Sequence, residues 1–294
     1  MKEETGNQIE IACRICGSNL GGPLLARKQR GQNVSQWSFC QNCESAHIEP
    51  YPSEDDMTRY YNSNYSEMDL AGANEGVNHK KRFSVEYEST VFAEYSFSLG
   101  DAGITAVEIK DKSLKVFDYG CATGGFLNYL ASMGVSKKNL FGYDIGSDMV
   151  LEASSKGYDC TANLSDIDGL SFDLITLWDV IEHVSHPKEV VKWVKSHLNH
   201  NGSVLVQTPH FSDLAINLGE AFSHYLVVEH LHLFSRKALI DLFELEGMRC
   251  SSQSSFGANA YAKSVAEPHK TAYDKLAKKY DFGATQVLLF RMED

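Results

Sequence analysis

Apolar and polar positions alternate in two different patterns through the second half of the chain. Residues 116–119 and 140–143 are short, mostly apolar runs, as expected of buried strands. Residues 187–199 instead place apolar side chains on one helical face, with proline at the first position. From residue 114 onward strand-like and helix-like segments follow each other in turn. This order predicts a parallel α/β sheet with helices on both faces.

Start and stop signals delimit three further helices. They are predicted over residues 126–133, 147–156 and 236–246, and the last follows Ser235, whose side chain suits a helix N-terminus. The segment 285–291 is rich in apolar and β-branched residues, which predicts that it forms the last strand. The α/β region is therefore predicted to span residues 113–294.

The first fifty residues show no amphipathic helix and are dominated by two Cys-x-x-Cys pairs. Four thiolates from Cys13, Cys16, Cys40 and Cys43 would complete the tetrahedral shell that Zn²⁺ favours. A redox site needs only one such pair at a helix start, so the duplication favours a metal. We expect a zinc-ribbon-like module over residues 1–52, with a structural zinc ion that stabilises a core too small to fold alone.

Residues 53–112 are predicted to form a helical linker or lid between the two regions. A capping signal opens a helix near 54–62, and a charged, aromatic helix is expected at 79–98. Tyr61 and Tyr65 are candidate lid residues over a ligand. Packing of a linker against the core is at least as good an explanation for these aromatic side chains.

Composition narrows the classes of function. The net charge of −12 disfavours a broad surface that follows nucleic-acid phosphates, because that needs clustered Lys and Arg. No apolar run is long enough to span a bilayer, and the N-terminus lacks the apolar region of a signal peptide. We therefore expect a cytoplasmic protein that acts on a small molecule.

The stretch 116–125, Val-Phe-Asp-Tyr-Gly-Cys-Ala-Thr-Gly-Gly, carries the most specific chemistry. Glycine at 120 and 124 permits positive φ and lets the backbone approach a ligand. Asp144 ends the next strand, where a carboxylate can accept hydrogen bonds from two ribose hydroxyls. A G-x-A-x-x-G pattern in the turn also fits a dinucleotide site, so a NAD-dependent oxidoreductase is an alternative. Asp118 favours a ligand with a cationic amine, because its carboxylate would repel a pyrophosphate.

This turn resembles motif I of class I S-adenosylmethionine (SAM) methyltransferases. Residues 172–187 are similar to the fourth-strand motif of that family, and 202–209 and 229–235 continue the resemblance in the right order. Together the matches cover roughly residues 80–250. The resemblance implies a doubly wound, Rossmann-like, mostly parallel seven-stranded sheet whose last strand is antiparallel. Residues 258–283 depart from the family pattern, which often has a tight hairpin there, and could add a lid helix or an oligomer contact.

The resemblance also implies roles for individual residues toward SAM. Asp118 and the glycine turn would hold the methionine part, Asp144 the ribose and Ile145 the adenine. Trp178 and the residue after it would flank the methionyl group or the acceptor, although a tryptophan on a strand is more often a core residue. The implied cofactor-binding set is Asp118, Gly120, Ala122, Gly124, Asp144, Ile145, Asn163, Leu164, Trp178 and Asp179.

Methyl transfer from a sulfonium is an in-line displacement, so the enzyme mainly has to align the reactants in a dry site. A hydroxyl acceptor must also lose a proton, and histidine is the side chain best tuned for this near neutral pH. Several histidines lie near the expected active face. His183, at the mouth of the fourth strand, and His230, in a segment that resembles an active-site loop, are our candidates for the base.

A metal-assisted mechanism is the alternative to this histidine base. Asp179-x-x-Glu182-His183 with a distant histidine resembles the metal site of ubiquinone-biosynthesis O-methyltransferases and small-RNA 2′-O-methyltransferases. There a divalent ion such as Mg²⁺ or Mn²⁺ would lower the pKa of the hydroxyl. Because aspartate stands at position 179 where those families carry glutamate, we expect the metal-free mechanism.

The acceptor is inferred from the N-terminal cysteines. Methyltransferases with zinc knuckles resemble enzymes of glycan and deoxysugar biosynthesis, including sugar C-methyltransferases with a further C-terminal domain. Since this sequence does not show that domain, we expect O-methylation of a sugar or another polyhydroxylated small molecule. A non-catalytic scaffold whose zinc module binds a partner is the remaining alternative, and the intact cofactor turn argues against it.

Overall fold

The computed structural model describes most of the chain outside its N-terminus and two longer segments. The helix expected near 54–62, apart from Met57, and the candidate lid residues Tyr61 and Tyr65 lie outside the described residues. The described residues are 12–19, 22–30, 33–53, 57, 85–105, 109, 113–226, 229–257 and 269–292.

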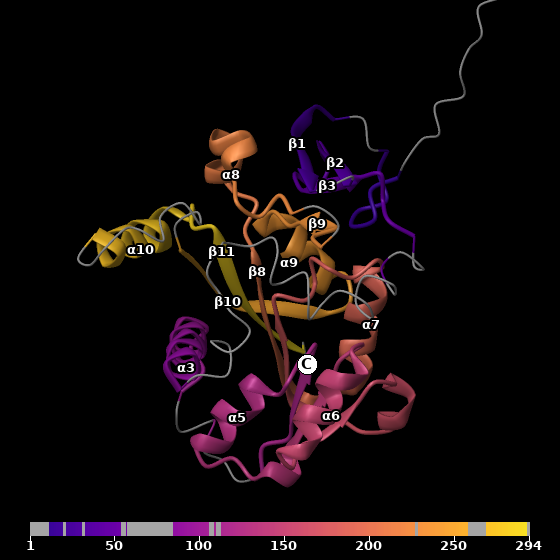
Figure 1. Ribbon diagram of the computed structural model, residues 1–294, viewed down its shortest axis with the longest axis vertical. Coiled ribbons are helices and arrows are strands. Elements are labelled where there is room, and N and C mark those ends of the chain that lie inside the picture. Colours follow the sequence, from indigo (N-terminus) through magenta and orange to yellow (C-terminus); the bar gives the residue numbers. More distant parts are fainter. Residues whose placement is uncertain are drawn as a thin grey trace, which may run out of the picture.

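A sheet covered by helices forms the centre of the molecule (Figure 1). It has seven strands, in the order β10-β11-β8-β7-β4-β5-β6. The strands from β6 to β8 run parallel, and β11 is antiparallel to both of its neighbours. This arrangement confirms the predicted α/β fold and the antiparallel last strand. The strands are β4 (Val116–Tyr119), β5 (Leu140–Tyr143), β6 (Asp159–Thr161), β7 (Phe172–Trp178), β8 (Leu198–Pro209), β10 (Met248–Phe256) and β11 (Thr285–Met292).

Helices cover both faces of this sheet, as the alternating pattern predicted (Figure 1). Phe117 packs with residues of α7 and α9, whereas its neighbour Val116 packs with residues of α3 and α5 on the other face. The helices predicted at 126–133, 147–156, 187–199 and 236–246 are confirmed, with ends that differ by no more than two residues. The helix expected at 79–98 is observed as Val85–Asp101, three residues longer at its C-terminal end, and residues 79–84 lie outside the described residues. The helices of this region are α3 (Val85–Asp101), α5 (Gly125–Ser132), α6 (Ser147–Ser155), α7 (Pro187–His197), α8 (Asp213–Leu218), α9 (Arg236–Glu244) and α10 (His269–Tyr280).

The N-terminal region forms a second sheet, which takes its fourth strand from the α/β region. Its order is β1-β2-β3-β9, with β1 (Leu24–Arg30), β2 (Asn33–Phe39), β3 (Ala46–Glu49) and β9 (His232–Leu233). The antiparallel pairing joins Ala46 to Leu233 and His47 to His232. Trp37 is fully buried in a cluster that includes Phe222. The module is thus joined to the α/β region by both strand pairing and a shared core.

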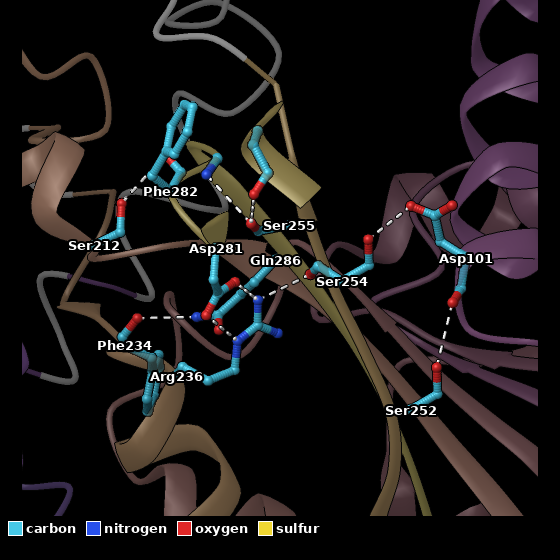
Figure 2. Close-up of polar contacts among 12 residues, drawn as sticks. Asp101, Ser212, Phe234, Arg236, Ser252, Ser254, Ser255, Asp281, Phe282 and Gln286 are labelled. Carbon is cyan, nitrogen blue, oxygen red and sulfur yellow. Dashed lines mark hydrogen bonds and ion pairs between the residues drawn. The ribbon is translucent and has the colours of Figure 1, made fainter. Parts of the chain in front are cut away.

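The predicted insertion before β11 contains helix α10. Ala277 on α10 is buried, and its carbonyl accepts a hydrogen bond of 3.1 Å from Ser255 Oγ on β10. Lys278 Nζ lies 2.6 Å from Asp101 Oδ1 at the end of α3, and Ser254 Oγ donates to Asp101 Oδ2. Figure 2 shows the serine contacts of Asp101. The helix is therefore fixed to both α3 and the sheet. No helix in the described part of the chain is long and apolar enough to span a membrane.

The start of α9 is tied to the residue that follows α10. Arg236 Nη2 lies 2.5 Å from Asp281 Oδ1, its Nε lies 3.3 Å from Oδ2, and Nη2 also donates to the carbonyl of Ser254 (Figure 2). Burial alone would raise the pKa of Asp281. The hydrogen bonds from Arg236 and its charge outweigh burial and hold this pKa below its usual value.

We expect Asp281→Asn to lower the free energy of unfolding at neutral pH. Asparagine tolerates the positive φ of 55° at this position, so the main change is loss of the charge. Because the folded-state pKa is depressed, the stabilisation is present above the unfolded-state pKa and is lost as pH falls through the folded-state value. Urea unfolding should show the difference between parent and variant shrinking from about pH 4 downward. A difference that stays constant over that range would contradict the interpretation.

Candidate functional site

The glycine turn between β4 and α5 has the backbone that the sequence predicted. Gly120 and Gly124 both have φ of 82°, and a Cβ on Gly120 would lie 2.4 Å from Val180 Cγ2. Ala122 also has a positive φ of 45°. Its N–H donates to Asp144 Oδ2 over 2.9 Å. The turn and the carboxylate at the end of β5 therefore face each other directly.

Asp144 lies between this turn and an exposed apolar side chain. The N–H of Gly146 donates to Asp144 Oδ1 over 2.8 Å. Ile145, which directly follows Asp144, is 48% exposed. Burial raises the pKa of Asp144, while the two backbone N–H groups lower it. A half-buried carboxylate beside an exposed apolar side chain suits a ribose with an attached base.

Asp118 is more deeply buried than most residues of the turn that follows it. Its Oδ1 accepts a hydrogen bond of 2.7 Å from Thr176 Oγ1 on β7. Burial raises the pKa of Asp118 to about 7, and the Asp144 carboxylate adds to the effect. A cationic amine near this group would favour its charged form.

The other predicted cofactor residues divide between exposed and packed positions. Asn163 is exposed and caps a short 3-10 helix, Leu164–Ile167, by accepting from the N–H of Ser165 over 3.2 Å. Leu164 packs partly against the core. Both follow β6, and the N–H of Asp144 donates to the carbonyl of Thr161 at the end of that strand. Asn163 and Leu164 therefore belong to the same sheet edge as Asp144.

Trp178 packs among aromatic side chains. Its ring centroid lies 4.9 Å from Tyr95 and 5.0 Å from Phe126, in the core between α3 and α5. A core position was the alternative to a cofactor contact that the sequence analysis gave for Trp178. Its buried Nε1 has no hydrogen-bond partner among the described residues. The indole N–H of Trp178, at the end of β7, is thus a donor without a partner among the described residues.

Asp179 is not part of the cluster that Glu182 and His183, the other two residues of its sequence motif, form with His230. It has a positive φ of 51° and is exposed, and its Oδ2 accepts from Gln207 Nε2 over 3.2 Å. Gln207 Oε1 in turn accepts from Ser98 Oγ on α3. The sequence pattern did not single out Gln207. The parallel register of β7 and β8 could have done so, because it pairs Gln207 with the residue before Asp179.

Glu182, His183 and His230 meet beyond the end of β7. One ligand atom of each lies within 4.8 Å of the others, and the two imidazole centroids are 4.7 Å apart. Glu182 is fully buried; its Oε2 accepts from Thr208 Oγ1 over 2.9 Å. Its Oε1 lies 3.8 Å from His183 Nε2 and has no hydrogen-bond partner among the described residues. The structure thus brings together the two predicted histidines and Glu182, the carboxylate named in the metal-assisted alternative.

Backbone carbonyls fix the orientation of both histidines. His183 Nδ1 lies 2.8 Å from the carbonyl of Glu229, and His230 Nδ1 lies 2.8 Å from that of His224. A carbonyl only accepts, so Nδ1 carries the hydrogen and Nε2 of the neutral ring keeps its lone pair. Burial lowers the pKa of both histidines and raises that of Glu182 well above its usual value.

The four predicted cysteines form a second cluster, in the N-terminal module. One Sγ of each lies within 4.8 Å of the others, and the Cys13–Cys43 and Cys16–Cys40 sulfur pairs are each 3.7 Å apart. Four sulfurs at 2.3 Å from one tetrahedral ion would be about 3.8 Å from each other. The residues present therefore fit a zinc ion.

Comparison with known proteins identifies the α/β region. The family described as "Methyltransferase domain" matches residues 90–253. The mitochondrial ubiquinone biosynthesis O-methyltransferase of Saccharomyces cerevisiae is 31% identical over 107 residues, which are 33% of this chain and 33% of that protein. The chain thus spans about a third of that curated relative.

A solved structure supports the fold independently. The crystal structure of magnesium protoporphyrin IX methyltransferase from Synechocystis PCC 6803 with bound SAH superimposes with a TM-score of 0.52. The sequence identity is 15%, and the match covers 82% of this chain and all of that one. At this identity the likeness shows a common fold.

We expect Asp144→Ala to weaken SAM binding at least tenfold. A charged acceptor contributes about 1.5–3 kcal/mol per hydrogen bond, and the ribose offers two hydroxyls. Calorimetric titration of the purified protein with SAM measures the change. Asp148→Ala is the matched control, because this aspartate lies on the exposed side of the adjacent helix α6. Unchanged SAM affinity in Asp144→Ala, or tight binding of NAD by the parent, would refute the assignment.

Proposed function

The chain belongs to the methyltransferase-domain family and is a SAM-dependent methyltransferase, and from this premise we propose that it methylates a hydroxyl of a small polyhydroxylated molecule. The proposed acceptor site is the cluster of Glu182, His183 and His230. The observation that carries the proposal is Glu182 Oε1, a buried carboxylate oxygen without a hydrogen-bond partner among the described residues. A buried carboxylate is costly unless a cation or a donor compensates it.

The donor set of this cluster favours the metal-assisted alternative over the histidine base. One carboxylate and two neutral imidazoles form a ligand set typical of divalent cations. Both imidazoles donate Nδ1–H to a carbonyl, as metal-ligating histidines commonly do. Aspartate at position 179 does not weaken this reading, because the three clustered residues supply the ligand set without it. A divalent ion held there would lower the pKa of the acceptor hydroxyl.

The residues around the cluster orient it toward its reactants. Thr208 holds one oxygen of Glu182, which leaves the other directed at His183. The carbonyls of Glu229 and His224 keep Nε2 of both histidines unprotonated. We propose that Asp118, the glycine turn and Asp144 hold SAM, with Ile145, Asn163 and Leu164 along the adenine. Trp178 would flank the methionyl group with its buried indole N–H, which has no hydrogen-bond partner among the described residues.

The acceptor class rests on three observations. The yeast relative is an O-methyltransferase by name, which supports transfer to oxygen. The net charge of −12 argues against nucleic-acid acceptors. The paired cysteine knuckles resemble those of sugar methyltransferases, which is why a sugar or glycan precursor is our choice among polyhydroxylated molecules. We further propose that Cys13, Cys16, Cys40 and Cys43 bind one structural zinc ion.

Removal of a divalent ion from the Glu182 cluster should abolish methyl transfer. A chelator that leaves the structural zinc bound is expected to stop transfer from radiolabelled SAM to a panel of polyhydroxylated compounds, and Mg²⁺ or Mn²⁺ should restore it. Zinc content is measured in the same samples. Full activity after chelation, falling as pH drops through the histidine pKa, would instead support a metal-free base.

Glu182→Gln tests the same site without an acceptor. The change keeps the volume and the bond from Thr208 but removes the charge, so Mn²⁺ affinity measured by electron paramagnetic resonance should fall at least tenfold. SAM affinity should stay unchanged. Glu189→Gln is the control, because Glu189 lies exposed in the first turn of α7. Equal Mn²⁺ binding by the two variants would exclude Glu182 as a ligand.

The double variant Cys13→Ser/Cys40→Ser should lose the structural zinc. It removes one thiolate from each knuckle, and two remaining thiolates do not complete a tetrahedral site. Elemental analysis is expected to give one zinc per parent chain and well under one per variant chain. A variant that keeps stoichiometric zinc would show that the ion lies elsewhere.

A further inference from the structure

A chain of buried polar side chains leads from the cysteine cluster to β9. His47 Nε2 on β3 lies 3.1 Å from Cys13 Sγ, and His47 Nδ1 lies 3.2 Å from His232 Nδ1. His232 Nε2 lies 2.8 Å from the hydroxyl of Tyr51. The two imidazoles are almost completely buried, at 1% and 0% exposure. Three segments distant in sequence thus meet in one row of hydrogen bonds.

The far end of this row is attached to the acceptor site. The N–H groups of Leu231 and His232 both donate to the backbone carbonyl of Glu182, over 2.8 and 3.2 Å. His230 directly precedes Leu231. The residue before His230 is Glu229, whose backbone carbonyl fixes the His183 ring. A displacement of His232 would therefore move Glu182 and both candidate metal-ligating histidines.

A second set of contacts, made by Ser235, attaches the C-terminal side of the β9 segment to the N-terminal module. Ser235 Oγ donates to the carbonyl of Cys43 over 2.7 Å and also caps α9. The N–H of Ser235 donates to Ser45 Oγ. The second cysteine knuckle therefore anchors the chain directly after β9, and His232 is held between two attachments to the module.

The direction of the hydrogen bonds follows from the thiolate. A metal-bound cysteine is deprotonated and only accepts, so His47 must carry its hydrogen on Nε2. His47 Nδ1 then accepts, and the facing Nδ1 of His232 must be the donor. His232 Nε2 is left to accept from the hydroxyl of Tyr51, which lies closer to it, at 2.8 Å, than to the carbonyl of Ser185, at 3.3 Å. All three hydrogen bonds therefore point toward Cys13.

We propose that His47 and His232 form a directional hydrogen-bond relay through which the metal-bound Cys13 fixes the position of Glu182 and His230. The two histidines are positioning residues: they touch neither SAM nor the acceptor. The proposal rests on zinc binding by the four cysteines. It assigns to the N-terminal module a role in the geometry of the acceptor site as well as in stability.

The first test reads the two tautomers in the unaltered protein. Long-range ¹H–¹⁵N spectra of the zinc-loaded full chain, labelled at histidine, should show His47 protonated at Nε2 and His232 at Nδ1. Single His→Gln variants assign the two signals. A His47 ring protonated at Nδ1 in a sample with one zinc per chain would overturn the relay. Zinc content near zero would instead refute the proposed zinc site.

The second test uses a substitution that restores the relay. His47→Gln keeps an N–H donor for the thiolate and an oxygen that accepts from His232, whereas His47→Leu keeps neither. Both variants should retain zinc, because the four thiolates are unchanged. In His47→Leu we expect amide hydrogen exchange of Leu231 to rise at least tenfold and Mn²⁺ affinity to fall by about 10–100-fold. His47→Gln should stay within about threefold of the parent in both measurements.

A matched control separates the relay from general loss of stability. His197→Leu also replaces a buried histidine, one that stacks on Trp193 at a distance from the acceptor site. It should lower the melting temperature without changing exchange at Leu231. Equal behaviour of His47→Leu and His47→Gln with zinc retained would overturn the proposal. If His47→Leu does not fold, the tautomers of the parent decide the question.

Discussion

The buried carboxylate of Glu182 is the constraint on which the rest of the site depends. An ionised group without solvent costs several kcal/mol unless charges or donors compensate it. Here Thr208 supplies one donor to the carboxylate, while the other oxygen faces the unprotonated Nε2 of His183 and has no hydrogen-bond partner among the described residues. The backbone carbonyl of Glu182 accepts from the N–H groups of Leu231 and His232. Strand β8, the segment before β9 and the loop after β7 therefore meet at one residue. The side chain of Glu182 is fully buried at this meeting point.

The parallel sheet explains why the cofactor residues and this carboxylate share one edge. Strands β4, β5 and β7 are neighbours that run in the same direction, so the glycine turn, Asp144 and Glu182 all follow carboxyl ends at one side of the sheet. Val180 fills the space beside Gly120 that a Cβ would occupy. The cofactor turn and the loop that carries Glu182 are thus packed against each other. The topology of the fold therefore places the proposed cofactor site and the proposed acceptor site side by side.

The sequence predicted the local features well, because they depend on neighbouring residues. Strand β5, the positive φ at Gly120 and Gly124 and the cap at Ser235 all follow from residue type and spacing. Features that depend on tertiary contacts were not predictable. The hydrogen bond from Gln207 to Asp179 depends on the register in which β7 and β8 pair. The pairing of residues 46 and 233 joins segments too distant for any local pattern to reveal.

The same contacts join the N-terminal module to the segment that carries His230 in the proposed acceptor site. A region this small cannot bury enough apolar surface to fold alone, so it needs a metal, a shared core or both. It shares Trp37 and Ile48 with the core around Phe222, and it takes β9 as its edge strand. Strand β9 begins two residues after His230. Whatever stabilises the module therefore restrains the segment that carries this histidine, and whatever loosens the module releases it.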